Sequence, residues 1–141
     1  MKHLSRFVAF IAFLITLVFQ SHAEIIDSPE HKRAEKFFES NQKLRQLTLK
    51  VFDLETTARC HVALATAIGF EMSGRLPLES NERLGYAMLY EAVAIGYLHH
   101  ISAGQEKKLK SGIEMYEKRS NKVADTQYCF NSLRAVLNSL N

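Results

Sequence analysis

Glu91 is the residue whose type and position most clearly suggest chemistry. It is the only formally charged residue among positions 84–98, which are otherwise apolar, aromatic or glycine. An ionised carboxylate within a buried helix is costly unless it is paired or hydrogen-bonded. A hairpin turn near Pro77 would bring Glu91 within reach of His61. The alternative is that Glu91 lies at the edge of the core and reaches water.

A contact between Glu91 and His61 would define a candidate polar site. A carboxylate beside an imidazole can transfer a proton, and both groups can bind a metal or orient a small ligand. Aromatic side chains on the same predicted helix could line such a site, namely Tyr86, Tyr90 and Tyr97. We therefore keep a ligand-binding or metal-binding module, centred on these residues, as one interpretation of the sequence.

The chain has two cysteines, Cys60 and Cys129, and both fall inside predicted helices. Such a pair is expected to be oxidised in an exported protein. The bond would close a long loop, for which the chain-entropy model gives about 4 kcal/mol of stabilisation. A disulfide-linked dimer or a reactive Cys60 are the alternatives, but Cys60 and His61 are adjacent on a helix and do not face each other. We predict an intramolecular disulfide.

Other motifs that carry chemistry are missing from the sequence. His99 and His100 are adjacent, so on a helix they point about 100° apart and cannot readily bind one metal. Their position near a helix end suits the negative pole of the helix dipole. The chain contains no His-Glu-x-x-His, Cys-x-x-Cys or Gly-x-Ser-x-Gly motif and no phosphate-binding loop. We expect no resident metal or cofactor and no enzymatic activity.

The first 23 residues have the pattern of a bacterial secretory signal peptide. Lys2 and Arg6 precede an apolar run at 7–19, and Ser21 and Ala23 place small residues before a cut after Ala23. The run is shorter than the roughly 20 residues that span a membrane. An uncleaved anchor is the alternative. We predict removal of residues 1–23, a mature domain at 24–141 in the periplasm or outside the cell, and no membrane span after processing.

Charge gives little support for a nucleic-acid partner. Loss of Lys2 and Arg6 with the signal peptide lowers the formal net charge from +3 to +1. Two basic runs, at 107–110 and 118–122, could meet anionic lipid or an acidic protein face. The glutamates interspersed along this region favour a mixed, solvated face instead. An exported location also argues against nucleic-acid binding.

Helix signals occur along the whole mature chain. Ser28 and Pro29 begin a first helix, which we expect to continue to about Phe52 and to break at Asp53; residues 40–41 are the other plausible break. A second helix at about 54–73 should end at Gly74. It should form an antiparallel hairpin with the third helix, which we expect to start after a Ser80 cap and stop at Gly104.

The last region, 105–141, reads as one long helix or two in series. Apolar side chains recur there every seven residues, which predicts a single apolar stripe. An interruption is expected, if anywhere, at 120–121 or at Asp125. The stripe comprises Leu109, Tyr116, Val123, Phe130 and Leu137.

These elements predict an all-α, single-domain bundle of four to six helices with one intramolecular disulfide. The apolar helix around 84–101 should lie at its centre, because a helix that is apolar on every side is usually buried. Small residues there, Ala92 and Gly96, would let a neighbouring helix approach closely. For function, we expect recognition of another protein in the bacterial envelope, as a small inhibitor, immunity or accessory protein.

Overall fold

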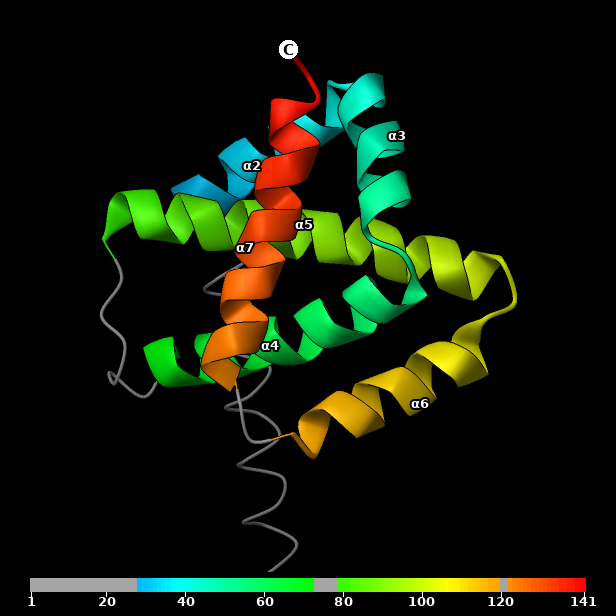
Figure 1. The fold of residues 1–141 in the computed structure, drawn as a ribbon. Coiled ribbons are helices and arrows are strands. Elements are labelled where there is room, and N and C mark those ends of the chain that lie inside the picture. The colour runs from blue at the N-terminus through cyan, green and yellow to red at the C-terminus, as the bar shows by residue number, and fades with distance from the viewer. Residues whose placement is uncertain (1–27, 73–78, 120–121) are drawn as a thin grey trace, which may run out of the picture.

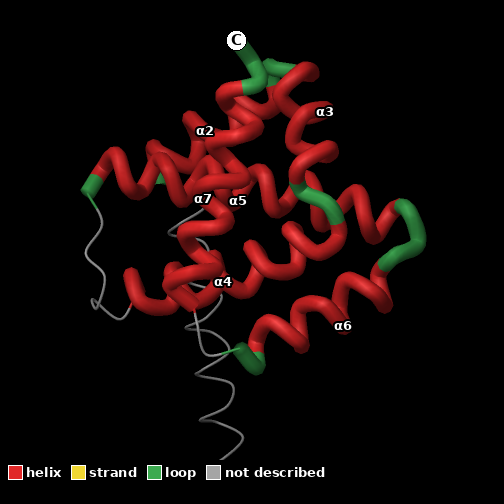
Figure 2. Tube along the Cα trace, in the orientation of Figure 1, coloured by secondary structure: helices red, strands yellow, loops and turns green. Residues whose placement is uncertain are grey.

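A computed structural model describes residues 28–72, 79–119 and 122–141, and these parts of the chain contain helices and no strands (Figures 1 and 2). The all-α prediction is confirmed, with the helix number at the upper end of the expected range. The predicted signal peptide at 1–23 and the predicted stop at 74–77 lie outside the described residues. The six helices are α2 (Pro29–Glu39), α3 (Gln42–Val51), α4 (Leu54–Met72), α5 (Ser80–Ser102), α6 (Glu106–Glu117) and α7 (Lys122–Asn138).

Short polar side chains begin three of these helices. Ser28 Oγ accepts the backbone N–H of His31 at 3.2 Å, as the sequence predicts for the start of α2. Asn41 caps α3 in the same way, since its Oδ1 accepts the backbone N–H of Leu44. Asp53 caps α4 by accepting the backbone N–H of Thr56. The expectation of one helix from Pro29 to about Phe52 is therefore wrong. Residues 40–41 break it, because the Asn41 side chain accepts the backbone N–H of Leu44 and so caps a new helix.

The start of α5 and the apolar stripe at 105–141 differ from the predictions. The residue that precedes α5 is Glu79 rather than Ser80, and its N–H donates to Glu82 Oε2 at 3.0 Å. Gly104 follows α5 with φ of 75°, in the left-handed region that glycine tolerates. Residues 105–141 form two helices, and the seven-residue stripe is interrupted because Val123 is 81% exposed.

The central position predicted for α5 is confirmed, because α5 contacts each of the other five described helices. Figure 1 shows α4 and α5 running in opposite directions, as predicted, with α7 crossing both. Leu89 and Ala92 of α5 are fully buried in the main core. The burial does not extend to the end of the helix, where Leu98 is 65% exposed. A smaller cluster under α6 contains Ala58, Val62, Leu109 and Tyr116.

The predicted disulfide joins α4 to α7. Cys60 and Cys129 have Cα atoms 5.5 Å apart, and the bond closes a loop with a sequence separation of 69. Both residues are fully buried. A disulfide is compatible with an extracellular, oxidising location. None of the described helices has the length and apolar character required to cross a membrane.

At Gly96, α5 comes close to Phe52 and to Thr57 near the start of α4. A Cβ atom at Gly96 would lie 2.5 Å from Thr57 Oγ1 and 3.3 Å from the Cβ of Phe52. The Thr57 hydroxyl cannot move away easily, because it is buried and donates to the Phe52 carbonyl at 3.0 Å. A Cβ at Gly85, on the same helix, would instead meet Phe130 at an ordinary 3.6 Å.

The two glycines give a matched test of this packing. We expect Gly96→Ala to destabilise the protein by about 1–3 kcal/mol, the usual cost of overpacking a core. Gly85→Ala should be neutral or should stabilise by up to about 1 kcal/mol, because alanine favours the helix. Urea unfolding midpoints measure both changes. Equal midpoints for the two variants would contradict the close contact at Gly96.

Candidate functional site

Glu91 lies against His31 rather than against His61. The carboxylate oxygen Oε1 of Glu91, on α5, is 3.3 Å from Nε2 of His31, on α2. The His31 side chain is 5% exposed and that of Glu91 is 16% exposed. The sequence suggested His61 as the partner of Glu91, and the structure places His31 there instead. We call this place the α2–α5 contact site; its other members are Tyr90, Glu35 and Glu39.

The sequence of α2 explains why His31 is buried. His31 precedes Ala34 by three positions and Phe38 by seven, so the three side chains share one face of the helix. That face packs against α5, and all three residues are buried. Tyr90 covers the imidazole edge-on, with ring centroids 5.1 Å apart.

The imidazole of His31 is held in its neutral form. Burial lowers its pKa below 6.5, although the carboxylate of Glu35 opposes this shift. Its Nδ1 is buried and has no hydrogen-bond partner among the described residues. A proton on Nδ1 would leave an unsatisfied N–H inside the protein, which is costly. The favoured tautomer therefore carries its proton on Nε2 and faces Glu91, so the contact is between a neutral ring and the carboxyl group.

Glu91 has the most strongly shifted carboxyl group of the described chain. Burial, and after it the carboxylates of Glu35 and Glu39, together raise its pKa from 4.5 to about 7. A neutral His31 provides no positive charge to oppose them. A carboxyl that titrates near neutral pH and is partly exposed can accept and release protons under physiological conditions.

His61, on α4, and the other predicted aromatic residues, on α5, have other neighbours. His61 stacks on Tyr97, with ring centroids 5.6 Å apart and planes at 24°. Burial lowers the pKa of His61, and Glu117 acts in the opposite direction. Tyr86 contacts the Phe130 ring edge-on at 4.9 Å. Of the residues predicted for the polar site, the structure brings together Glu91 and Tyr90 and leaves His61 with a different neighbour.

The paired histidines at the end of α5 differ in environment. His100 is buried, with Nε2 3.1 Å from the Phe52 carbonyl oxygen and Nδ1 3.2 Å from the Gln105 side chain. It therefore ties the end of α5 to the turn between α3 and α4. His99 is exposed. Within the described residues, no group of three or more His, Cys, Asp or Glu side chains could hold a metal ion.

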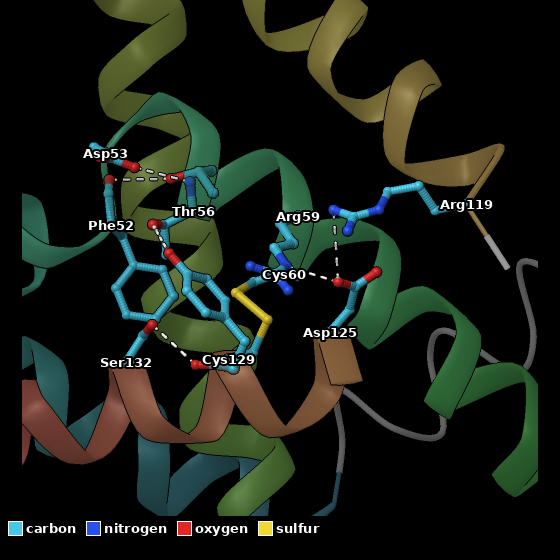
Figure 3. Close-up of a disulfide and its surroundings, with 11 residues drawn as sticks. Phe52, Asp53, Thr56, Arg59, Cys60, Arg119, Asp125, Cys129 and Ser132 are labelled. Atoms are coloured by element: carbon cyan, nitrogen blue, oxygen red, sulfur yellow. Dashed lines mark hydrogen bonds and ion pairs between the residues drawn. A yellow bond between two sulfur atoms is a disulfide. The ribbon is translucent and has the colours of Figure 1, made fainter. Parts of the chain in front are cut away.

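A second polar cluster surrounds the disulfide, at the junction of α4 and α7 (Figure 3). Arg59 Nε donates to Asp125 Oδ1 at 2.7 Å, and Asp125 is almost fully buried. Arg119 also points at this carboxylate, with Nη1 at 4.0 Å. The Arg59 guanidinium lies 3.9 Å from the centroid of the Tyr128 ring, a favourable cation–π distance.

The same cluster connects α6 to α4. The Tyr116 hydroxyl donates to Glu55 Oε1 at 2.7 Å. Burial, and then this hydrogen bond, raise the pKa of Tyr116, so the phenol keeps its proton and remains a donor. The hydroxyl groups of Thr56 and Tyr128 share a hydrogen bond, with their oxygen atoms 2.9 Å apart. Because its charged and hydroxyl groups bond to one another, this cluster reads as structural: it fixes α4, α6 and α7 around the disulfide.

The sequence contained signals for residues that we did not select. His31 repeats the spacing of the buried face of α2, which marks it as a buried polar residue. Arg59 directly precedes Cys60, and Asp125 comes one helical turn before Cys129. Once the disulfide is assumed, residues close to the two cysteines are brought near one another. A basic residue beside Cys60 and an acidic residue one turn before Cys129 are therefore candidates for an ion pair.

The described part of the two basic runs, 107–110 and 118–119, lies on α6 and directly after it. Lys107, Lys108 and Lys118 are exposed, and Lys110 pairs with Glu106 at 2.8 Å. An exposed pair of this kind contributes little to stability. The mixture of charges agrees with the solvated face that the sequence favours.

The titration of Glu91 can be measured directly. In carboxyl-carbon NMR spectra we expect the Glu91 signal to titrate near pH 7, well above an ordinary glutamate. In a Glu35→Gln/Glu39→Gln double variant the midpoint should fall, because two carboxylates that oppose ionisation are removed. His31 should titrate below 6.5 in the same samples. A Glu91 midpoint near 4.5 in the parent protein would contradict the geometry described for this site.

No known family model, curated protein or solved structure matches this chain. The function therefore has to be inferred from its own residues and their arrangement.

Proposed function

We propose that this chain is an exported bacterial envelope protein that acts by recognising another protein, as a small inhibitor, immunity or accessory protein. The basic, apolar and small residues at the N-terminus support export. The buried disulfide supports an oxidising compartment such as the periplasm.

The main support for a recognition role comes from the surface where α6 ends and α7 begins, which we call the α6–α7 corner. Two large apolar side chains are exposed there: Met115 on α6 at 53% and Val123 on α7 at 81%. Lys118 and Arg119, between them in sequence, are also exposed. Methionine and arginine are enriched in protein interfaces, and apolar side chains with a polar rim are typical of them.

The corner is also held in place, which lowers the entropic cost of binding. Arg119 reaches the buried carboxylate of Asp125 at 4.0 Å and lies 5.2 Å from the centroid of the Tyr116 ring. These contacts connect the end of α6 to the start of α7. We propose that the partner presents an apolar patch bordered by carboxylates, which would pair with Lys118 and Arg119.

Export can be tested by the mass of the protein recovered from periplasmic extract. We expect a mature chain that begins at Glu24 and contains no reactive thiol when it is denatured without a reducing agent. The expected result follows from the signal pattern and the disulfide. A mass that still includes residues 1–23 would show an uncleaved anchor, and a cytoplasmic location would contradict the proposed role.

The corner can be tested by site-specific photocrosslinking in the cells that produce the protein. Val123→p-benzoylphenylalanine should give a discrete protein adduct in the envelope. Ala135→p-benzoylphenylalanine is the matched control, because Ala135 is exposed on α7 but lies away from the corner. Lys118→Glu should reduce the adduct several-fold, since it reverses a charge at the rim. No adduct at 123, or equal adducts at both positions, would contradict the proposal.

A further inference from the structure

The α2–α5 contact site combines three carboxyl groups from two helices with no positive charge among them. Glu91 belongs to α5, whereas Glu35 and Glu39 belong to α2 and act on Glu91 electrostatically. His31, whose imidazole touches Glu91, also belongs to α2. It is buried, and its Nδ1 has no hydrogen-bond partner in the part of the chain that the structure describes. Tyr90 of α5 contributes an aromatic edge. The charged groups that act on Glu91 therefore come from α2, the helix that packs across it.

We propose that the α2–α5 contact site is a pH-dependent switch in which the proton on Glu91 controls how firmly α2 packs against α5. With Glu91 protonated, two carboxylates of α2 face a neutral group. With Glu91 ionised, like charges oppose each other across the contact between the helices, and α2 is loosened. This property goes beyond the proposed recognition role and does not depend on any partner.

The direction of the pH dependence follows from linkage. The pKa of Glu91 is raised in the packed state, so its contribution to packing is complete below 4.5 and is lost as pH rises through about 7. The pKa of His31 is lowered, so its contribution is complete above 6.5 and is lost as pH falls towards the lowered value. Packing of α2 should therefore be firmest on the mildly acidic side of neutrality and weaker above pH 7.

The size of the effect can be estimated from the Glu91 shift. If Glu91 returns to its ordinary pKa of 4.5 when α2 separates, the opening equilibrium should increase by about tenfold between pH 6 and pH 8. His31 acts in the opposite direction over part of this interval and reduces the net change to several-fold. In Glu91→Gln only the His31 contribution remains, so opening of α2 should fall slightly over the same interval.

Amide hydrogen exchange followed by mass spectrometry measures the opening of α2 separately from the rest of the protein. Exchange of peptides covering 29–39 is compared at pH 6 and pH 8 after correction for the intrinsic exchange rate. In the parent protein we expect a several-fold loss of protection in α2 at pH 8. Peptides from α7, which the disulfide fixes to α4, should show no such change.

Matched variants decide whether Glu91 is responsible. Glu91→Gln should abolish or reverse the pH dependence in α2, whereas Glu114→Gln, which removes an exposed carboxylate on α6, should preserve it. Glu35→Gln/Glu39→Gln should reduce it, and this variant decides the question if Glu91→Gln does not fold, because both residues are exposed. An unchanged pH dependence in the folded variants, or none in the parent protein, would overturn the proposal.

Discussion

The covalent link between Cys60 and Cys129 is the constraint on which the rest of the fold depends. It fixes α7 across α4 within the main core, where both sulfur atoms are fully buried. With the two helices fixed there, residues near the two cysteines are also brought together: Arg59, next to Cys60, lies beside Asp125, which is one turn before Cys129. A buried ion pair is favourable only if its geometry is good. The disulfide helps to supply that geometry, since it restricts how the two helices can move relative to each other.

No comparable link holds α2. Among the described residues, both cysteines lie on α4 and α7, so α2 is held by apolar packing of Ala34 and Phe38 and by the polar contact at Glu91. Stability is not uniform within a protein, and segments held by few buried groups open first. The same molecule can thus combine a rigid part, where we propose that a partner binds, with one helix whose packing responds to protons.

Local patterns predicted most of this fold, because helix caps and apolar spacing act over a few residues. The caps at Ser28 and Asp53, the glycine after α5 and the disulfide are all found as predicted. The sequence did not predict the pairing of Glu91 with His31. A turn between α4 and α5 suggested His61, but α2 packs across α5 and brings another histidine to the carboxylate. Such a choice depends on helix crossing, which local spacing does not determine.

Glu91 could serve only as a hydrogen-bond acceptor for His31, or it could also make the packing of α2 depend on pH. If the site needed only an acceptor for the Nε2 proton of His31, a glutamine carbonyl would serve without any charge. A carboxyl group in the same place adds a free-energy term that varies with pH, because its ionised form is opposed by burial and by Glu35 and Glu39. Neutral His31 cannot cancel that term, since its own protonation is disfavoured by burial and by the unpartnered Nδ1. The loosening of α2 above pH 7 therefore comes from the arrangement of the site as a whole. It would be lost if the carboxyl were replaced by its amide, which leaves only the opposite contribution of His31.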